Sequence, residues 1–136
     1  MSPTRRATLV LAEDHPQLSR DLCALLQDEF DVVGIAADGA ALLTLAQRLR
    51  PDVVVTDIGM PGMDGIAAAT QLVRLLPGLP VVFVSVYVEP EIVQRALAIG
   101  RAFVEKAAAG DELTCAVKLV LAGDGFISAS IASPKR

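Results

Sequence analysis

The sequence has few aromatic residues and few cysteines. It contains four phenylalanines, one tyrosine and no tryptophan, yet 53% of its 136 residues are hydrophobic. The core must therefore be built mainly from Val, Leu, Ile and Ala, and one domain of this length buries roughly two thirds of its unfolded surface. The two cysteines, Cys23 and Cys115, form neither a metal-binding spacing nor a disulfide framework, so we expect both to be small, buried, reduced residues.

The sequence also lacks an excess of basic residues and any long apolar run. The formal net charge is −4, which argues against a nucleic-acid-binding surface, because such surfaces need clustered Lys and Arg. No apolar run approaches the length of about 20 residues that spans a bilayer. The first residues, MSPTRRATLVLAED, have too short an apolar run for a signal peptide. We therefore expect a single cytoplasmic domain with no membrane contact.

Apolar runs of strand length alternate along the chain with stretches of helical period. Several of these runs are apolar without alternation, which is typical of strands covered on both faces. Pro51, the Pro77-Gly78 turn, Gly100 and Gly123 stand where elements should change. The pattern predicts an α/β domain with a parallel sheet of five strands and with five helices. The strands are expected over residues 7–12, 31–36, 52–57, 80–85 and 101–105, and the last three helices over 66–76, 89–99 and 111–122.

Charged and polar side chains stand at the ends of the expected strands. Glu13 and Asp14 follow the first strand and Asp57 ends the third. Ser85 ends the fourth strand, and Lys106 follows the fifth. In open parallel sheets, ligands bind at the carboxyl ends of the strands. If the first and third strands are neighbours, the three carboxylates converge in one pocket.

A pocket with three carboxylates needs compensation, by protonation or by a cation. Hard oxygen ligands from few residues suit Mg²⁺, and the backbone carbonyl of Gly59 could supply a further ligand. With Lys106 and Ser85 on the other sides, the arrangement is typical of phosphoryl transfer to a carboxylate. Asp57 is the expected nucleophile, because it alone is flanked by both the acid pair and the Lys106 and Ser85 strand ends.

Four segments carry a resemblance to a known family. They are LVLAEDHP with the acid pair, VVVTDIGMPGMDG around Asp57, VVFVSVY with Ser85, and AFVEK with Phe103 and Lys106. Together they resemble response-regulator receiver domains of two-component signalling, over nearly the whole chain. EDHPQL and KAAAGDELTCAVKLVLAGDGFIS are most similar to the NarL-type (LuxR-like) subgroup. The resemblance implies a flavodoxin-like, doubly wound sheet with strand order 2-1-3-4-5, and it divides the chain into an N-terminal tail (1–6), a receiver domain (7–124) and a C-terminal segment where a linker begins (125–136).

The resemblance also implies the chemistry of the pocket. A sensor histidine kinase would transfer a phosphoryl group to Asp57. Mg²⁺ would be held by Glu13, Asp14, Asp57 and the backbone carbonyl of Gly59, and Lys106 would bind the phosphoryl group. Such a domain is not a conventional enzyme, but Mg²⁺-dependent self-phosphorylation from a phosphodonor and slow hydrolysis of the aspartyl phosphate are expected.

A switch would follow phosphorylation in a receiver of this kind. Ser85 would move toward the phosphoryl group and Phe103 would follow inward, which would alter a partner-binding face and could favour a homodimer. Gly59 and Tyr87 would set the rate of dephosphorylation by controlling the access of water. In the NarL-type subgroup a helix-turn-helix domain contacts DNA, so DNA binding is expected only through an output domain absent from this sequence. The function implied is the regulatory domain of a transcriptional regulator.

The sequence departs from the family pattern near the fifth strand. The stretch from Gly100 to Lys106, GRAFVEK, is one residue shorter than usual, and Glu105 stands where an apolar residue is customary. These departures leave open a phosphorylation-independent scaffold, or pseudo-receiver. A flavodoxin-like cofactor carrier would need a phosphate-binding loop after the first strand, where EDHP stands. A phosphatase of the haloacid-dehalogenase type would need a second Asp in place of Gly59.

Two further polar residues have structural interpretations. His15, the only histidine, precedes Pro16 and is expected to begin the first helix rather than to carry a phosphoryl group. Asp64, directly before Gly65, is expected to be a helix N-cap.

Overall fold

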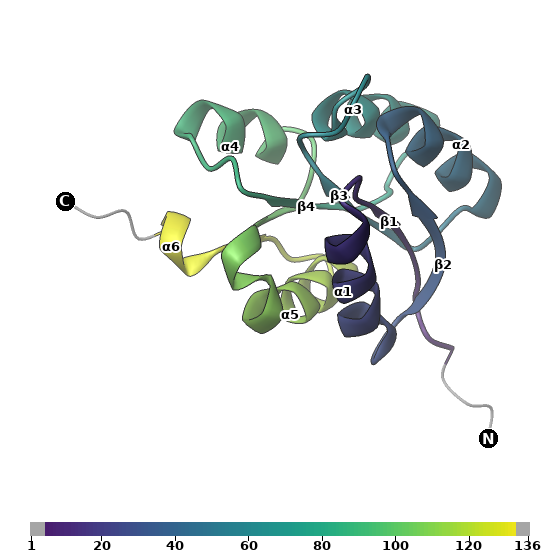
Figure 1. Cartoon of the computed structure of the whole chain (residues 1–136), viewed down its shortest axis with the longest axis horizontal. Coiled ribbons are helices and arrows are strands. Elements are labelled where there is room, and N and C mark those ends of the chain that lie inside the picture. The colour runs from purple at the N-terminus through teal and green to yellow at the C-terminus, as the bar shows by residue number, and fades with distance from the viewer. Residues whose placement is uncertain (1–4, 133–136) are drawn as a thin grey trace.

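The computed structural model describes residues 5–132 and contains one parallel sheet. The strands are ordered β2-β1-β3-β4-β5-β6, so β1 and β3 are neighbours, as the converging carboxylates require. Figure 1 shows this sheet between two layers of helices. The strands are β1 (Thr8–Ala12), β2 (Asp31–Ala36), β3 (Val53–Asp57), β4 (Val81–Ser85), β5 (Ala102–Glu105) and β6 (Phe126–Ile127).

Helices cover both faces of the sheet (Figure 1). One apolar cluster joins α2, α3 and α4 to one face, and a second joins α1 and α5 to the other. Within the residues described, no helix is long and apolar enough to cross a membrane. The helices are α1 (Pro16–Gln27), α2 (Gly39–Leu49), α3 (Gly65–Leu75), α4 (Pro90–Leu97), α5 (Ala109–Leu121) and α6 (Ala129–Ala132), with a short 3₁₀ turn η1 (Lys106–Ala108).

Local sequence accounts for where the central elements begin. All residues of β3 and β4 are buried, as their unbroken apolar runs predicted. The side chain of His15 accepts a hydrogen bond from the amide of Leu18 at the start of α1, and Asp64 accepts one from the amide of Ala67 at the start of α3. Both residues are therefore helix N-caps, and this interpretation of each is confirmed.

The prediction of five strands and five helices was wrong in one respect. Within the residues described, the C-terminal segment adds a strand, β6, and a short helix, α6. β6 lies parallel to β5 and extends the sheet beyond the expected order 2-1-3-4-5. Of the predicted N-terminal tail and C-terminal segment, residues 1–4 and 133–136 lie outside the described part of the chain.

The cysteine prediction was correct in part. Cys23 and Cys115 are both free thiols. Cys23 is half-buried, but Cys115 on α5 is exposed, so the expectation that both are buried was wrong. α5 turns its apolar stripe toward the sheet, and Cys115 lies outside that stripe.

The shortened stretch before Lys106 leaves β5 in regular register. Phe103 is paired with Phe83, and Glu105 with Ser85. The chain turns tightly at Gly100, where a Cβ atom would lie 2.5 Å from a ring carbon of Phe83 and 2.8 Å from the carbonyl oxygen of Val81. Gly100 therefore lets the turn pack directly on β4.

We expect Gly100→Ala to lower the free energy of unfolding by about 1–3 kcal/mol, the usual cost of overpacking a filled core. Urea denaturation followed by circular dichroism would measure the loss. Gly110→Ala in α5 is the matched control, because no atom lies within 4 Å of the added Cβ. Alanine there should leave stability unchanged or raise it slightly. Equal effects of the two substitutions would contradict this account of Gly100.

Candidate functional site

The carboxyl ends of β1, β3 and β5 open into one pocket of about 360 Å³. The parallel strands carry their terminal residues to the same edge of the sheet, and the loops that follow form the walls. The pocket is lined by Glu13, Asp14, His15, Leu18, Asp57, Gly59, Val86, Tyr87 and Lys106.

Three acidic side chains meet in this pocket. Carboxylate oxygens of Glu13, Asp14 and Asp57 all lie within 4.8 Å of one another. Glu13 is 3% exposed and Asp57 is 6% exposed, whereas Asp14 is open to solvent. The amide of Ile58 donates a 2.7 Å hydrogen bond to Oδ1 of Asp57, which fixes the rotation of this carboxylate. The predicted convergence of the acids is thus present in the fold.

Lys106 bridges two of the acids. Its Nζ lies 3.0 Å from Oδ2 of Asp57 and 2.9 Å from Oε1 of Glu13. Burial alone would lower the pKa of Lys106, but its close contacts and charge interactions with Glu13 and Asp57 outweigh burial and raise the pKa. The ammonium therefore stays charged at neutral pH. The ion pairs of Lys106 contribute their full stability below the pKa of the unfolded chain, about 10.4. That contribution is lost only as the pH rises through the higher pKa of Lys106 in the folded protein.

The charges and donor atoms of this pocket fit a divalent cation. Three carboxylates face one ammonium, so two formal negative charges are left over among the lining residues. Within the described part of the chain, Oε1 of Glu13 is buried and has no hydrogen bond of normal geometry, although Lys106 lies close to it. Carboxylate oxygens are the ligands that Mg²⁺ prefers. The donor set therefore suits Mg²⁺, and Gly59 lies at the same pocket.

Ser85 lies beside the pocket but is turned toward the backbone. It is fully buried, and its Oγ accepts a 2.8 Å hydrogen bond from the amide of Tyr87. The ring of Tyr87 stands over Gly59, where a Cβ atom would lie 2.8 Å from a ring carbon of Tyr87. Tyr87 itself is 47% exposed. The ring thus forms a partial wall at the mouth of the pocket.

Phe103 is placed in the core and away from the pocket. It is fully buried in the cluster that joins the sheet to α4. The structure therefore shows Phe103 in an inward position while Ser85 bonds to Tyr87. Leu18 and Val86 also line the pocket, and neither was predicted. Val86 directly follows the end of β4, and that position was the one signal that could have indicated it.

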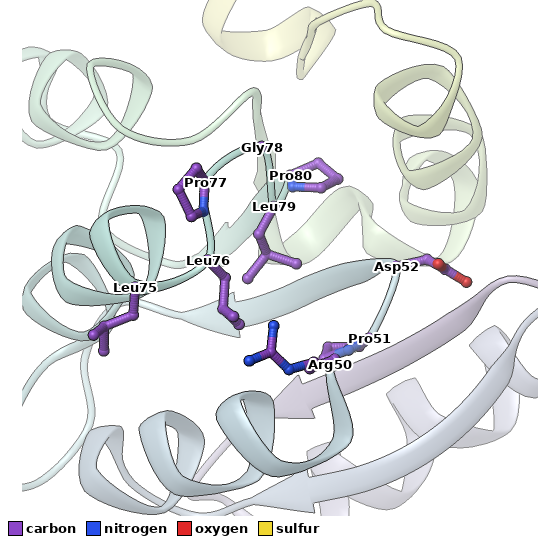
Figure 2. A pocket seen from close by; sticks show the side chains of 9 residues that line it. All are labelled: Arg50, Pro51, Asp52, Leu75, Leu76, Pro77, Gly78, Leu79 and Pro80. Atoms are coloured by element: carbon purple, nitrogen blue, oxygen red, sulfur yellow. The ribbon is translucent and has the colours of Figure 1, made fainter.

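A second hollow lies at the amino-terminal ends of β3 and β4, opposite the acidic pocket, and among the residues described it holds no cluster of carboxylates. It encloses about 310 Å³ between the turn before β3 and the turn before β4 (Figure 2). Asp52 at its rim accepts hydrogen bonds from the amide and hydroxyl of Thr8, and the amide bond is the main reason that the pKa of Asp52 is lowered. In Figure 2 this carboxylate points away from Leu76 and Leu79. Asp52 thus anchors β1, and the acidic pocket remains the candidate site.

Comparisons with known proteins agree with this geometry. The family model of the response regulator receiver domain matches residues 9–118. The response regulator GacA of Pseudomonas aeruginosa is 35% identical over 127 residues, which are 91% of this chain and 59% of GacA. The chain thus spans less than two thirds of the length of this curated relative.

Solved structures show the same fold. The signal receiver domain of NarL from Mycobacterium tuberculosis is 33% identical, with a TM-score of 0.83 over 88% of this chain and 99% of that one. The isolated REC domain of RcsB from Salmonella enterica serovar Typhimurium, determined with the phosphomimetic BeF₃⁻, is 26% identical with a TM-score of 0.87. That match covers 94% of this chain and 97% of the other. Because the family match spans most of the sequence and the sheet carries its acids to one edge, the chain belongs to the response regulator receiver domains of two-component systems, in the branch related to transcriptional regulators.

Proposed function

We propose that this chain is a phosphorylation-activated receiver that accepts a phosphoryl group on Asp57 from a sensor histidine kinase. The observation that supports this proposal best is the pairing of Asp57 with Lys106 at 3.0 Å in the acidic pocket. A buried carboxylate on a rigid strand, held by one ammonium, is placed for nucleophilic attack. The RcsB receiver solved with BeF₃⁻ adds support from a structural neighbour.

The transfer needs little rearrangement of the protein. A carboxylate oxygen of Asp57 forms a bond to phosphorus while the bond from phosphorus to the donor's imidazole nitrogen breaks, and the leaving imidazole keeps its electron pair and takes up a proton. The hydrogen bond from Ile58 holds the attacking carboxylate in place. Lys106 stabilises the charge that spreads over the phosphoryl oxygens in the transition state.

Glu13, Asp14, Asp57 and the backbone carbonyl of Gly59 would hold Mg²⁺. When bound, Mg²⁺ supplies positive charge beside the phosphoryl oxygens. Glu13 and Asp14 then serve to offset that charge and to position Asp57. Oε1 of Glu13, which now lies beside Lys106, would be the Glu13 oxygen available to the metal.

The switch would work through Ser85 and the residues around it. To donate to a phosphoryl group, the Ser85 side chain must turn away from the amide of Tyr87, which now binds its Oγ. Phe103 is already buried, so in this chain the change would lie in the end of β4 and β5 rather than in a swing of the aromatic ring. Tyr87 over Gly59 would limit the access of water to the aspartyl phosphate.

The wider role would follow from the relatives. We infer a cytoplasmic regulatory domain that switches its partner-binding face and forms a homodimer on phosphorylation. DNA would be contacted only through an output domain. Among the structural neighbours, two RcsB dimers have been solved bound to two parallel DNAs. The alternative is a phosphorylation-independent scaffold. The regular register of β5 and the contact between Lys106 and Asp57 favour the phosphorylated receiver.

We expect Mg²⁺ and acetyl phosphate to add one phosphoryl group to the protein. Intact-mass spectrometry would detect it, and beryllofluoride should change the fluorescence of Tyr87, the only tyrosine in a chain without tryptophan. Asp57→Asn should lose both responses, whereas Asp124→Asn, an exposed loop substitution, should keep both. A folded protein that gives neither response at millimolar Mg²⁺ would support the scaffold instead.

Asp14→Asn should stabilise the protein in EDTA and abolish its stabilisation by Mg²⁺. The substitution removes one of three crowded negative charges, and Asp14 makes no ion pair with Lys106 within the described structure. Relief of one exposed repulsion at about 4 Å is worth about 1 kcal/mol. Thermal unfolding with and without Mg²⁺ measures both effects. Asp124→Asn changes the net charge by the same amount, but it should neither stabilise the protein in EDTA nor abolish the stabilisation by Mg²⁺. If Mg²⁺ still stabilises the Asp14→Asn protein, Asp14 is not a metal ligand.

Tyr87→Ala should shorten the lifetime of the aspartyl phosphate several-fold. The substitution removes the ring that stands over Gly59 and opens the pocket to water. The loss of the phosphorylated mass after removal of the phosphodonor gives the rate. Val86→Ala is the control, because Val86 lines the same pocket but is 61% exposed. An unchanged lifetime in Tyr87→Ala would exclude the ring as a barrier to water.

A further inference from the structure

Residues 126–132, here called the C-terminal strap, lie along the outer edge of β5. Phe126 is paired with Ala102, and Ile127 with Phe103. The amide of Phe126 donates to the carbonyl of Arg101 at 3.2 Å, and the amide of Ser128 donates to the carbonyl of Phe103 at 2.9 Å. The strap is therefore attached through the backbone to the strand that carries Phe103.

Side chains add a second set of bonds to the strap. Ser128 is fully buried, and its Oγ accepts a 2.7 Å hydrogen bond from the amide of Glu105 while donating to the carboxylate of Glu112. Glu112 also accepts a hydrogen bond from the amide of Ala129. Ser130 donates from its hydroxyl to the carboxylate of Glu105. One glutamate from β5 and one from α5 thus bind the strap, which gives the unusual Glu105 a structural partner.

The strap packs less completely against α4 than against β5. Ile131 contacts the apolar cluster that contains Phe103 and Val93. A hollow of about 570 Å³ remains between the start of α4 and the strap, lined in part by Pro90, Val93, Glu105 and Ile131. Figure 1 shows α6 at the side of the domain, beside the beginning of α5 and across from α4. The strap therefore has room to shift without a clash.

Glu105 connects this surface to the acidic pocket. It is paired with Ser85 in the sheet and directly precedes Lys106. Lys106 now reaches both Glu13 and Asp57, and a phosphoryl group on Asp57 would occupy the space between Nζ and that carboxylate. Lys106 would have to retreat from the carboxylate, and a shift of its backbone would act first on Glu105. The amide of Glu105 donates to Oγ of Ser128, and the carboxylate of Glu105 accepts from Ser130.

We propose that the edge of β5 is a docking surface for the chain's own C-terminal strap, and that phosphorylation of Asp57 loosens the strap through Glu105. The inference rests on the proposed phosphorylation of Asp57. Ser128, Ser130 and Glu112 then have a positioning role in the switch. The position of the strap differs between the unphosphorylated and the phosphorylated pocket. By linkage, a loosened strap in turn favours binding of the phosphoryl group by the same factor.

Amide hydrogen exchange measured by NMR tests the proposal. With Mg²⁺ and beryllofluoride, the amides of Ser128, Ile131 and Ala132 should exchange roughly 5-fold faster or more, the lower end of usual coupling between sites. The amide of Val54, which bonds to Pro80 in the central sheet, should stay protected and serves as the internal reference. Bound beryllofluoride is detected independently by fluorine NMR. Bound beryllofluoride with unchanged or slower strap exchange overturns the strap proposal alone, whereas absence of binding to the folded protein overturns the proposed function and the strap with it.

Ser128→Ala provides the reciprocal test. The loss of its bonds to Glu105 and Glu112 should speed strap exchange before any beryllofluoride is added and should tighten beryllofluoride binding. Thr44→Ala, an exposed hydroxyl on α2, should change neither. Loss of protection at the Val54 amide in Ser128→Ala would mean that the whole sheet is destabilised. Ser130→Ala is then used instead, because it removes only the hydrogen bond from Ser130 to Glu105. Strap exchange or beryllofluoride affinity that does not differ from the Thr44→Ala protein overturns the proposal.

Discussion

The contact of one ammonium with two buried carboxylates is the constraint on which the rest of this structure depends. Lys106 reaches Glu13 and Asp57 at about the same distance, and this is possible only if β1, β3 and β5 end at the same edge of the sheet. The parallel order that places β3 beside β1 and β4 meets that requirement. Leaving two buried carboxylates without a partner costs several kcal/mol, so the pocket and the sheet order support each other.

The same contact does not neutralise the pocket. Asp14 adds a third carboxylate that Lys106 does not reach within the described structure, and one oxygen of Glu13 stays without a well-formed hydrogen bond. A site that served only to stabilise the fold would gain from fewer charges. The surplus of negative charge is instead what a bound cation would offset, and a fold that keeps three carboxylates together gives up stability for it.

Most of the sheet and the acidic pocket could be predicted from the sequence, because both depend on local signals. Unbroken apolar runs predicted β3 and β4, and acids and a lysine at strand ends predicted the pocket. β6 could not be predicted in this way, since two residues are too few to show a period. Three partners of Ser128 are distant in sequence, namely Phe103, Glu105 and Glu112, so only the folded chain shows them. The buried position of Phe103 likewise depends on its packing under α4 and the strap.

The position of the strap at a sheet edge limits the free energy that its release requires. An edge strand can be hydrated, so the carbonyl of Phe103 and the amide of Glu105 would exchange protein partners for water rather than be left unbonded. A hydrogen bond exchanged for water contributes only about 0.5–1.5 kcal/mol, although the carboxylate contacts of Ser128 and Ser130 add to this. A phosphoryl group that interacts differently with Lys106 in the two states can supply a few kcal/mol of coupling. Phosphorylation of Asp57 would therefore have less to overcome at this outer strand than at a strand in the middle of the sheet.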